Sequence, residues 1–315
     1  MARTQTGMSR CGIVLAGGDG SRLESFVRRL RGDALPKQYV DFTGRGSLLE
    51  QTFHRAERLI PARRLFTVVS RHHFVFPDVW RQLADRPGGR VVVQPENKDT
   101  APGLLLPLVR VLGEYGDGTV VVFPSDHSID DDEAFMAYVE RACEAVEHRP
   151  SRMVLLGVAP TTPEADYGYV VPGGSGPGGL RPVTRFVEKP GAVRAAELIA
   201  RGALWNSFVM VFRAKTLWEY VESLTPSLAA AFRRLALAET PKAERADIDE
   251  VYRCIQPVNF SSAFLRRLPG LVRPALTVLE MGGVGWTDCG VEARLPEAVR
   301  EAARAPIADP VPLCA

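Results

Sequence analysis

The 315-residue sequence has few cysteines, no long apolar run and almost no net charge. Its five cysteines are widely spaced without a C-x-x-C pair, which argues against a disulfide framework or a zinc knuckle. The longest apolar stretches, such as residues 103–109, are too short to span a bilayer, and residues 1–12 lack the apolar core of a secretory signal. A formal charge of +2 favours neither nucleic acid nor an acidic membrane as a partner. We therefore expect a soluble cytoplasmic protein with free thiols.

Lysine is also scarce, because only five of the 39 basic residues are lysines. In a chain that uses arginine for most of its positive charge, a retained lysine suits a compact ammonium group beside a phosphate, although chance could also leave one in place. Three of the five, Lys37, Lys98 and Lys189, lie in the motifs described below. The five histidines are scattered, and none has an evident nucleophile as a partner, so a Ser-His-Asp set is not indicated.

Short segments rich in Val, Ile, Leu and Phe alternate with amphipathic segments in the first half of the chain. The apolar segments lie at 11–18, 64–70, 90–97, 118–127 and 152–160, and helical periodicity is present at 47–60 and 133–148. This alternation is typical of βαβ units around a parallel sheet that is buried on both faces. The sequence therefore predicts an α/β fold.

The pattern changes after about residue 165. Two extended segments within 167–190 are joined by a glycine-rich loop, and a helix at 192–202 and a strand at 204–214 follow. Residues 215 to about 255 have helical character, and 276–290 begin with a final strand and end in an acidic loop. A mainly helical segment is therefore expected between the strands of the core and the last strand.

The first apolar segment ends in a glycine-rich turn, LAGGDGSRL, at 15–23. The backbone amides of such a turn can approach phosphate oxygens closely. Ser21, Arg22 and Leu23 follow Gly20, so the third glycine of a dinucleotide fingerprint is absent, and no G-x-x-x-x-G-K-[ST] pattern occurs. What remains is a glycine turn with a cation two residues beyond it. It fits either a phosphate site or an ordinary strand-to-helix turn.

Further charged residues could complete a phosphoryl-transfer site. Lys37, in LPKQY, could clamp a polyphosphate together with Arg22, and a surface salt bridge is the alternative. Asp126 follows a buried strand and Asp288 lies in GWTDCG; both could bind Mg²⁺, although Asp126 could instead cap a turn. We expect His127 to be structural, because magnesium prefers oxygen ligands. The sequence alone does not show whether the two carboxylates meet.

The motif RFVEKP places Glu188 and Lys189 side by side on an expected strand, where their side chains point to opposite faces. At the border of a pocket, one of them could hold a sugar hydroxyl and the other a phosphate. Taken alone, the motif is more typical of a charged surface pair.

Eight motifs occur in one order along the chain: LAGGDGSRL, PKQY, QPENKDTAPG, FPSDH, YGYV, FVEKP, LWNSFVMVF and GWTDCG. From about Cys11 to Gly290, this series resembles the sugar-1-phosphate nucleotidylyltransferases, most closely the mannose-1-phosphate guanylyltransferases. The resemblance implies a Rossmann-like three-layer nucleotide-diphospho-sugar transferase fold with a mixed, mostly parallel central sheet and a helical C-terminal segment. It also implies a Mg²⁺-dependent enzyme that transfers a nucleotidyl group from GTP to mannose 1-phosphate by in-line attack at the α-phosphorus, giving GDP-mannose and pyrophosphate.

The same resemblance implies roles for individual residues. It implies Arg22 and Lys37 as the catalytic cations, and Asp126 and Asp288 as the metal ligands. The implied nucleotide-binding residues are Leu15, Ala16, Gly17, Gly18, Gly20, Gln94, Asn97 and Thr100. The implied sugar-phosphate-binding residues are Gly168, Glu188, Lys189 and Asn206. Nucleoside triphosphate and sugar 1-phosphate are then the expected partners, and a homodimer is left open.

The expected organisation is a flexible N-terminus at 1–10, a nucleotidyltransferase core at 11–213, a mainly helical segment at 214–275, and a returning strand with the metal-binding loop and a tail at 276–315. The chain stops soon after GWTDCG, without a further domain for phosphomannose isomerase activity, so we expect a transferase only.

Two positions depart from the family pattern. Ser261 stands where an acidic residue is expected, and Phe208 stands where a glycine usually follows WNS. Both lie on the expected sugar side of the site. The same chemistry on another hexose 1-phosphate or with another nucleotide is therefore one alternative, and a catalytically silent relative that binds nucleotide sugars and regulates a partner is another. Retention of both carboxylates and of the cations argues against the silent relative. A dehydrogenase is the weakest alternative, because the dinucleotide fingerprint is incomplete.

Overall fold

The computed structural model describes residues 9–237, 241–271 and 276–304. Within them, a nine-stranded sheet has the order β3-β2-β1-β4-β8-β5-β9-β7-β6. The strands are β1 (Arg10–Ala16), β2 (Leu65–Ser70), β3 (Val91–Gln94), β4 (Thr119–Pro124), β5 (Met153–Val158), β6 (Gly168–Pro172), β7 (Leu180–Glu188), β8 (Leu204–Arg213) and β9 (Leu276–Met281). The apolar segments predicted to be strands thus form the centre of the molecule.

The sheet is mixed, as predicted. Strands β1 to β4 are mutually parallel, so their carboxyl ends lie along one edge of the sheet. Strand β8 runs antiparallel to β4 and β5 between them, and β9 pairs parallel with β5. The hairpin of β6 and β7 completes the sheet through antiparallel pairing with β8 and β9. The last strand in the chain therefore lies inside the sheet, next to strands from the core.

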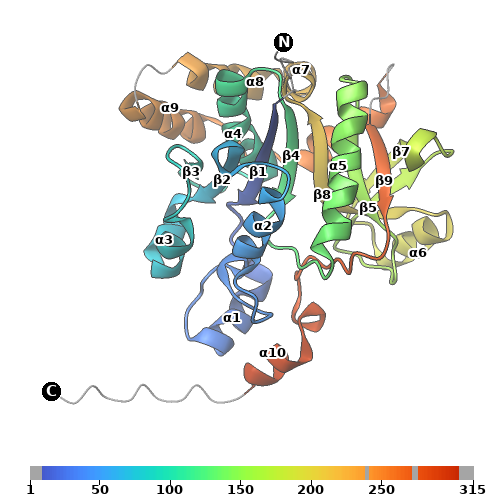
Figure 1. Ribbon diagram of the computed structural model, residues 1–315, viewed down its shortest axis with the longest axis horizontal. Helices are drawn as coiled ribbons and strands as arrows, with labels where there is room; N and C mark the ends of the chain where they lie inside the picture. The colour runs from blue at the N-terminus through green and yellow to red at the C-terminus, as the bar shows by residue number, and fades with distance from the viewer. Residues whose placement is uncertain (1–8, 238–240, 272–275, 305–315) are drawn as a thin grey trace, which may run out of the picture.

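Helices cover both faces of this sheet (Figure 1). The helices in the described residues are α1 (Glu24–Arg31), α2 (Leu48–Glu57), α3 (Pro77–Leu83), α4 (Thr100–Tyr115), α5 (Asp132–His148), α6 (Ala192–Ala200), α7 (Ala214–Leu224), α8 (Pro226–Arg233), α9 (Pro241–Cys254) and α10 (Glu297–Ala302), and α10 lies away from the sheet (Figure 1). Consecutive residues of β1 alternate between the two apolar layers. Ile13 belongs to the layer that includes residues of α4, α7 and α8, whereas Val14 belongs to the layer that includes residues of α1, α2 and α5. The predicted three-layer α/β architecture is confirmed.

A smaller apolar cluster lies at the β6 end of the sheet. Tyr167, Tyr169 and Trp205 pack there against α6. Buried side chains on both sides of Gly168, the first residue of β6, therefore support the hairpin.

The predicted helical segment after residue 214 corresponds to α7, α8 and α9. The expected flexible N-terminus falls largely on residues 1–8, outside the described residues, and Arg10 already belongs to β1. The expected tail at 305–315 also lies outside them. In the part of the chain that is described, no helix combines the length and the apolar character needed to span a membrane.

Candidate active site

A cleft of about 410 Å³ lies at the carboxyl ends of β1 and β4. A second cavity of about 350 Å³ adjoins it and shares Leu15, Gly18 and Thr100 with it. The predicted site residues that line the cleft are Leu15, Gly18, Gly20, Arg22, Lys37, Thr100, Asp126, Gly168, Glu188, Asn206 and Asp288. Gly17, Gln94 and Asn97 line the second cavity. Most of the residues that the motifs single out are thus gathered around one continuous opening.

The glycine turn between β1 and the helical turn Ser21–Leu23 is held through its carbonyl groups. Gln38 Nε2 donates hydrogen bonds to the carbonyls of Ala16 (2.9 Å) and Gly18 (2.7 Å). Ser70 Oγ donates to the carbonyl of Gly17 at 2.7 Å. A Cβ on Gly18 would meet nothing within 4 Å, so the backbone of the turn borders open space in the cleft. Ala16 itself is buried and lines neither cavity.

Gly17 and Gly20 allow close contacts behind this turn. A Cβ on Gly17 would lie 2.5 Å from Nε2 of Gln94. Gly20 has φ = 64°, and a Cβ there would lie 3.1 Å from the backbone nitrogen of Lys37. A side chain at either position would displace the residues that the turn holds in place.

The residues predicted to contact the nucleobase surround the second cavity. Gln94 is buried and donates through Nε2 to Ser70 Oγ (2.9 Å) and to the Gly17 carbonyl (3.3 Å). Asn97 Nδ2 donates to Asp19 Oδ2 at 3.1 Å. The Thr100 hydroxyl accepts a hydrogen bond from the Phe260 amide at 2.8 Å. Gln94 therefore supports the glycine turn in addition to lining the cavity.

Lys37 links the two loops that carry the predicted metal ligands. Its Nζ lies 2.9 Å from Oδ2 of Asp126 and donates to the carbonyls of Asp288 (3.0 Å) and Cys289 (3.3 Å). The lysine is buried, with 9% of its surface exposed. An ammonium group has three donors on a compact centre, so it can serve three oxygens in a space that a planar guanidinium would not fit.

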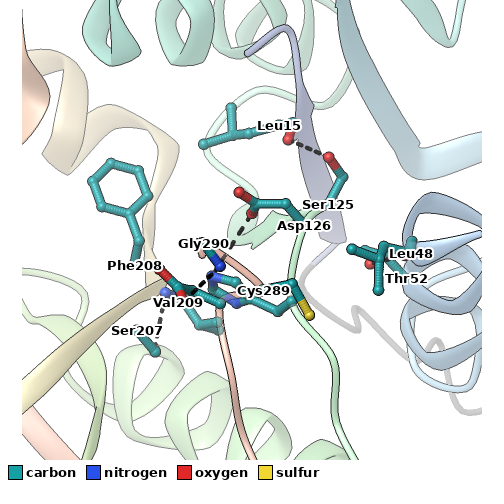
Figure 2. Close-up of polar contacts among 12 residues, drawn as sticks. Leu15, Leu48, Thr52, Ser125, Asp126, Ser207, Phe208, Val209, Cys289 and Gly290 are labelled. Atoms are coloured by element: carbon teal, nitrogen blue, oxygen red, sulfur yellow. Dashed lines mark hydrogen bonds and ion pairs between the residues drawn. The ribbon is translucent and has the colours of Figure 1, made fainter. Parts of the chain in front are cut away.

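Asp126 follows β4, and its neighbour Ser125 is tied to β1 by a hydrogen bond from Oγ to the Leu15 carbonyl at 2.7 Å (Figure 2). Burial alone raises the pKa of Asp126, but the charge of Lys37 and its hydrogen bond to the carboxylate oppose burial, and that pKa lies below its ordinary value. The carboxylate is therefore ionised at neutral pH. Burial also lowers the pKa of His127 to about 4, which leaves its ring neutral, and His127 Nδ1 accepts from Trp286 Nε1 at 3.2 Å.

Asp288 is brought beside Asp126 by a short antiparallel bridge. The amide of Ser128 donates to the Thr287 carbonyl at 2.9 Å, and the amide of Thr287 donates to the Ser128 carbonyl at 3.0 Å. Oδ1 of Asp288 accepts hydrogen bonds from Tyr167 OH (2.8 Å), Arg294 Nη1 (2.9 Å) and the Gly290 amide (2.9 Å). Burial and the Asp288 carboxylate both raise the pKa of Tyr167, so its hydroxyl keeps the proton that it donates.

The two carboxylates fit a divalent cation that prefers oxygen ligands. Lys37 contacts Oδ2 of Asp126, and three donors share Oδ1 of Asp288, which leaves the other oxygen of each carboxylate for an ion. A Cβ on Gly290 would lie 2.5 Å from Oδ2 of Asp288, so glycine keeps this oxygen accessible. Sequence reasoning missed Tyr167 and Arg294. The YGYV motif could have indicated Tyr167, but no local signal indicated Arg294.

Arg22 lies at the cleft with an exposed side chain. Its Nη1 is 3.0 Å from Oδ2 of Asp166, and both residues line the cleft. The pair is about half exposed, so the two side chains are weakly held and Arg22 can exchange this partner for a phosphate. Asp166 was not predicted as a site residue.

Three of the predicted sugar-side residues converge on β6, β7 and β8. Gly168 is paired with Glu188 across the hairpin, and a Cβ on Gly168 would lie 3.0 Å from Glu188 Oε2 and 3.5 Å from Asn206 Cβ. Burial raises the pKa of Glu188, and this effect outweighs the charge of Lys189 and the hydrogen bond from Ser261. Lys189 has φ = 43° and an exposed side chain, and it lines neither cavity.

The two departures from the family pattern lie near this side of the cleft. Phe208 lines the cleft and has φ = 60°, a backbone conformation that glycine adopts easily and that is strained for phenylalanine (Figure 2). Its ring packs edge-on against Phe260, with centroids 5.9 Å apart. Ser261 is buried and hydrogen-bonds to Glu188. The positive φ explains why a glycine is expected at position 208.

The chain is similar to known proteins in sequence and in structure. The chain is 33% identical over 223 residues to the xanthan biosynthesis protein XanB of Xanthomonas campestris pv. campestris, covering 70% of this chain and 46% of XanB. It is 28% identical over 286 residues to the mannose-1-phosphate guanylyltransferase ManC of Salmonella typhimurium, covering 88% of this chain and 57% of ManC. The chain thus spans about half the length of these curated relatives.

A solved structure from Thermus thermophilus, described as a mannose-1-phosphate geranyltransferase, is also similar. It has a TM-score of 0.76 and 30% sequence identity, over 90% of this chain and 77% of that chain. The family model described as nucleotidyl transferase matches residues 11–304, which include every predicted site residue. The chain therefore belongs to the nucleotidyl transferase family.

Proposed function

We propose that this chain transfers the guanylyl group of GTP to mannose 1-phosphate, giving GDP-mannose and pyrophosphate. The observation that carries the proposal is the position of Lys37, which joins Asp126 to the Asp288 loop within a cleft that also contains the glycine turn. Cations, paired carboxylates and an open glycine backbone are the groups that phosphoryl transfer requires. The name of ManC, a mannose-1-phosphate guanylyltransferase, supports the choice of substrates.

The cleft offers a separate place for each part of the reaction. The glycine turn, Arg22 and Lys37 can neutralise a triphosphate, and Gly168, Glu188 and Asn206, which line the same cleft, can contact sugar hydroxyls. Asp126 and Asp288 would hold Mg²⁺, which supplies positive charge to the phosphates when it is bound.

No covalent enzyme intermediate is required. The sugar phosphate is an anionic nucleophile: one of its oxygens forms a bond to the α-phosphorus as the bond to the pyrophosphate oxygen breaks on the opposite side. The protein must overcome repulsion between two polyanions and hold them in line. Lys37 is fixed by three oxygens before substrate binds, so its charge is positioned in advance.

A matrix of four nucleoside triphosphates and several sugar 1-phosphates, with Mg²⁺ and with pyrophosphate release as the readout, tests the proposal. We expect the fastest release with GTP and mannose 1-phosphate. A preference for another pair would favour the same chemistry on other substrates. Binding of nucleotide sugar without release in any pair would favour the silent regulatory relative and overturn the proposed activity.

Substitutions of the two carboxylates test the assignment of the site. Asp126→Asn and Asp288→Asn should each lower turnover by about 10²-fold or more, because each removes a negative ligand from the proposed metal site. Asp85→Asn is a matched control, because Asp85 is exposed and lies outside both cavities. Near-normal turnover in a folded Asp126 or Asp288 variant would remove that residue from the site.

A further inference from the structure

Outside the cleft lies a second group of side chains of the types that bind metal ions. Asp19 belongs to the glycine turn, and His72 and His73 lie in the helical turn Arg71–Val75 that follows β2. Because β1 and β2 are parallel neighbours, the turns at their carboxyl ends meet at one edge of the sheet. Oδ1 of Asp19 lies 2.9 Å from Nε2 of His72 and 3.5 Å from Nε2 of His73. One ligand atom from each of the three residues lies within 4.8 Å of the other two.

His73 provides a second, independent observation. Its side chain has no exposed surface, and its Nδ1 lies 3.1 Å from the hydroxyl of Tyr39. Its Nε2 is buried and makes no hydrogen bond with any described residue, yet it points toward Asp19. A buried polar atom without a partner is costly, and binding an ion is one way to satisfy it.

Two imidazole nitrogens and one carboxylate oxygen suit a zinc-type ion better than magnesium. A tetrahedral ion with metal–nitrogen bonds of about 2.0 Å places its ligand atoms roughly 3.3 Å apart. The two separations measured from Asp19 Oδ1, 2.9 and 3.5 Å, lie on either side of this value. His72 and Asp19 are exposed, so small rotations of their side chains can complete the geometry and leave a fourth position for water.

We propose that Asp19, His72 and His73 form a binding site for a divalent transition-metal ion of the zinc type, separate from the Mg²⁺ site. Asp19 also accepts a hydrogen bond from Asn97, at 3.1 Å through Oδ2. A bound ion would therefore hold Asp19 between His72 and Asn97, and would fix the glycine turn to the entrance of the second cavity.

The test is Zn²⁺ binding to the full chain by isothermal titration calorimetry, after chelator treatment and in excess Mg²⁺ to occupy the catalytic carboxylates. Absorption spectra with Co²⁺ in place of Zn²⁺ report the ligand geometry. We expect one equivalent to bind to the unaltered protein, and at least about ten-fold weaker binding in His72→Ala and in Asp19→Asn. Both altered side chains are exposed, so the variants should fold, and thermal melting checks this.

Two control variants separate this site from adventitious binding. His54→Ala removes another exposed histidine, and Cys254→Ser removes the exposed thiol. Both controls should bind Zn²⁺ as tightly as the unaltered protein. Absence of binding to the unaltered protein, equal binding by His72→Ala, or loss of binding in Cys254→Ser would each overturn the proposal.

Discussion

The ammonium group of Lys37 lies 2.9 Å from the carboxylate of Asp126 and donates hydrogen bonds to the backbone of the loop that contains Asp288. The two aspartates are far apart in the chain, and each follows a different strand. One buried cation therefore fixes the relative position of the two carboxylates and lowers the pKa of Asp126.

Replacing this lysine should disable the site. In Lys37→Met the apolar stem is retained, but Asp126 loses its closest positive charge and the Asp288 loop loses two hydrogen bonds. We expect turnover to fall by about 10²- to 10³-fold, the usual effect of removing a fixed donor from a charged transition state. Pyrophosphate release at saturating substrate measures this loss.

Lys215→Met is the matched control, because Lys215 has an exposed side chain at the start of α7. It should retain full turnover. Lys37→Arg should recover little of the lost activity, because a planar guanidinium does not fit the space of three converging oxygens. Turnover of Lys37→Met within a few-fold of the unaltered protein would remove Lys37 from the catalytic machinery.

Much of the fold could be predicted because its signals are local. Each apolar segment carries its own strand signal, and the glycine turn and acidic loops mark where strands end. The position of β9 has no such signal. In its pairing with β5, Leu276 lies opposite Met153, and this register depends on how the intervening chain packs. A late strand can be recognised in the sequence, but its neighbours in the sheet cannot.

The site shows the same division. The sequence singles out Lys37, Asp126 and Asp288 because their neighbours form recognisable motifs. The partners Tyr167 and Asp166 become relevant only when remote loops fold together, since hydrogen bonds across 121 and 144 residues leave no spacing pattern. Arg294 is six residues from Asp288, but it lies outside every motif. The sequence indicates no role for His72 and His73, because no nucleophile accompanies them, and their contact with Asp19 depends on the parallel pairing of β1 and β2.

Removing the Tyr167 hydroxyl should weaken metal binding without unfolding the protein. The hydroxyl donates to Oδ1 of Asp288 at 2.8 Å, so Tyr167→Phe removes one of the three donors that orient the carboxylate. The ring keeps its packing against Trp205 and Trp286. Partners that orient a ligand typically contribute 10- to 100-fold in affinity, so we expect the Mg²⁺ concentration for half-maximal activity to rise at least about ten-fold.

A magnesium titration of pyrophosphate release measures this change. Tyr138→Phe serves as a control, because the Tyr138 hydroxyl hydrogen-bonds to the backbone of Gly282, and neither residue lines the cleft. A Tyr167→Phe protein with the same magnesium requirement and a lower maximal rate would assign the hydroxyl to substrate instead of Asp288.

The buried thiol of Cys143 should make the protein less stable at alkaline pH. Burial raises the pKa of Cys143 from 9.0 to about 12. Between these two values the unfolded chain loses the thiol proton while the folded protein keeps it, so the free energy of unfolding falls as the pH rises. Below pH 9 the thiol is protonated in both states and contributes no pH dependence.

Urea unfolding on both sides of pH 9 measures this dependence. Cys143→Ala should lose less stability with rising pH than the unaltered protein, by up to about 1.4 kcal/mol per pH unit for one titrating group. Cys254→Ala, which removes an exposed thiol, should leave the slope unchanged. Equal slopes for Cys143→Ala and the unaltered protein would contradict the raised pKa.

Two substitutions of Phe208 distinguish loss of the ring contact from relief of backbone strain. With φ = 60°, the position favours glycine over any residue with a Cβ. Phe208→Gly and Phe208→Ala both lose the edge-on contact with Phe260, but only glycine also relieves the backbone strain. We expect the glycine variant to be about 1 kcal/mol more stable than the alanine variant, measured by chemical unfolding.

The same pair of variants tests whether Phe208 limits the sugar side of the cleft. Both substitutions remove a ring that lines the cleft near Asn206, so both should raise the relative kcat/KM for sugar 1-phosphates bulkier than mannose 1-phosphate. The two variants differ in backbone strain but open nearly the same space in the cleft. Similar specificity in both would therefore assign the change of specificity to the loss of side-chain volume. A change of specificity in Phe208→Gly alone would assign it to backbone freedom, and no change in either would exclude Phe208 from sugar selection.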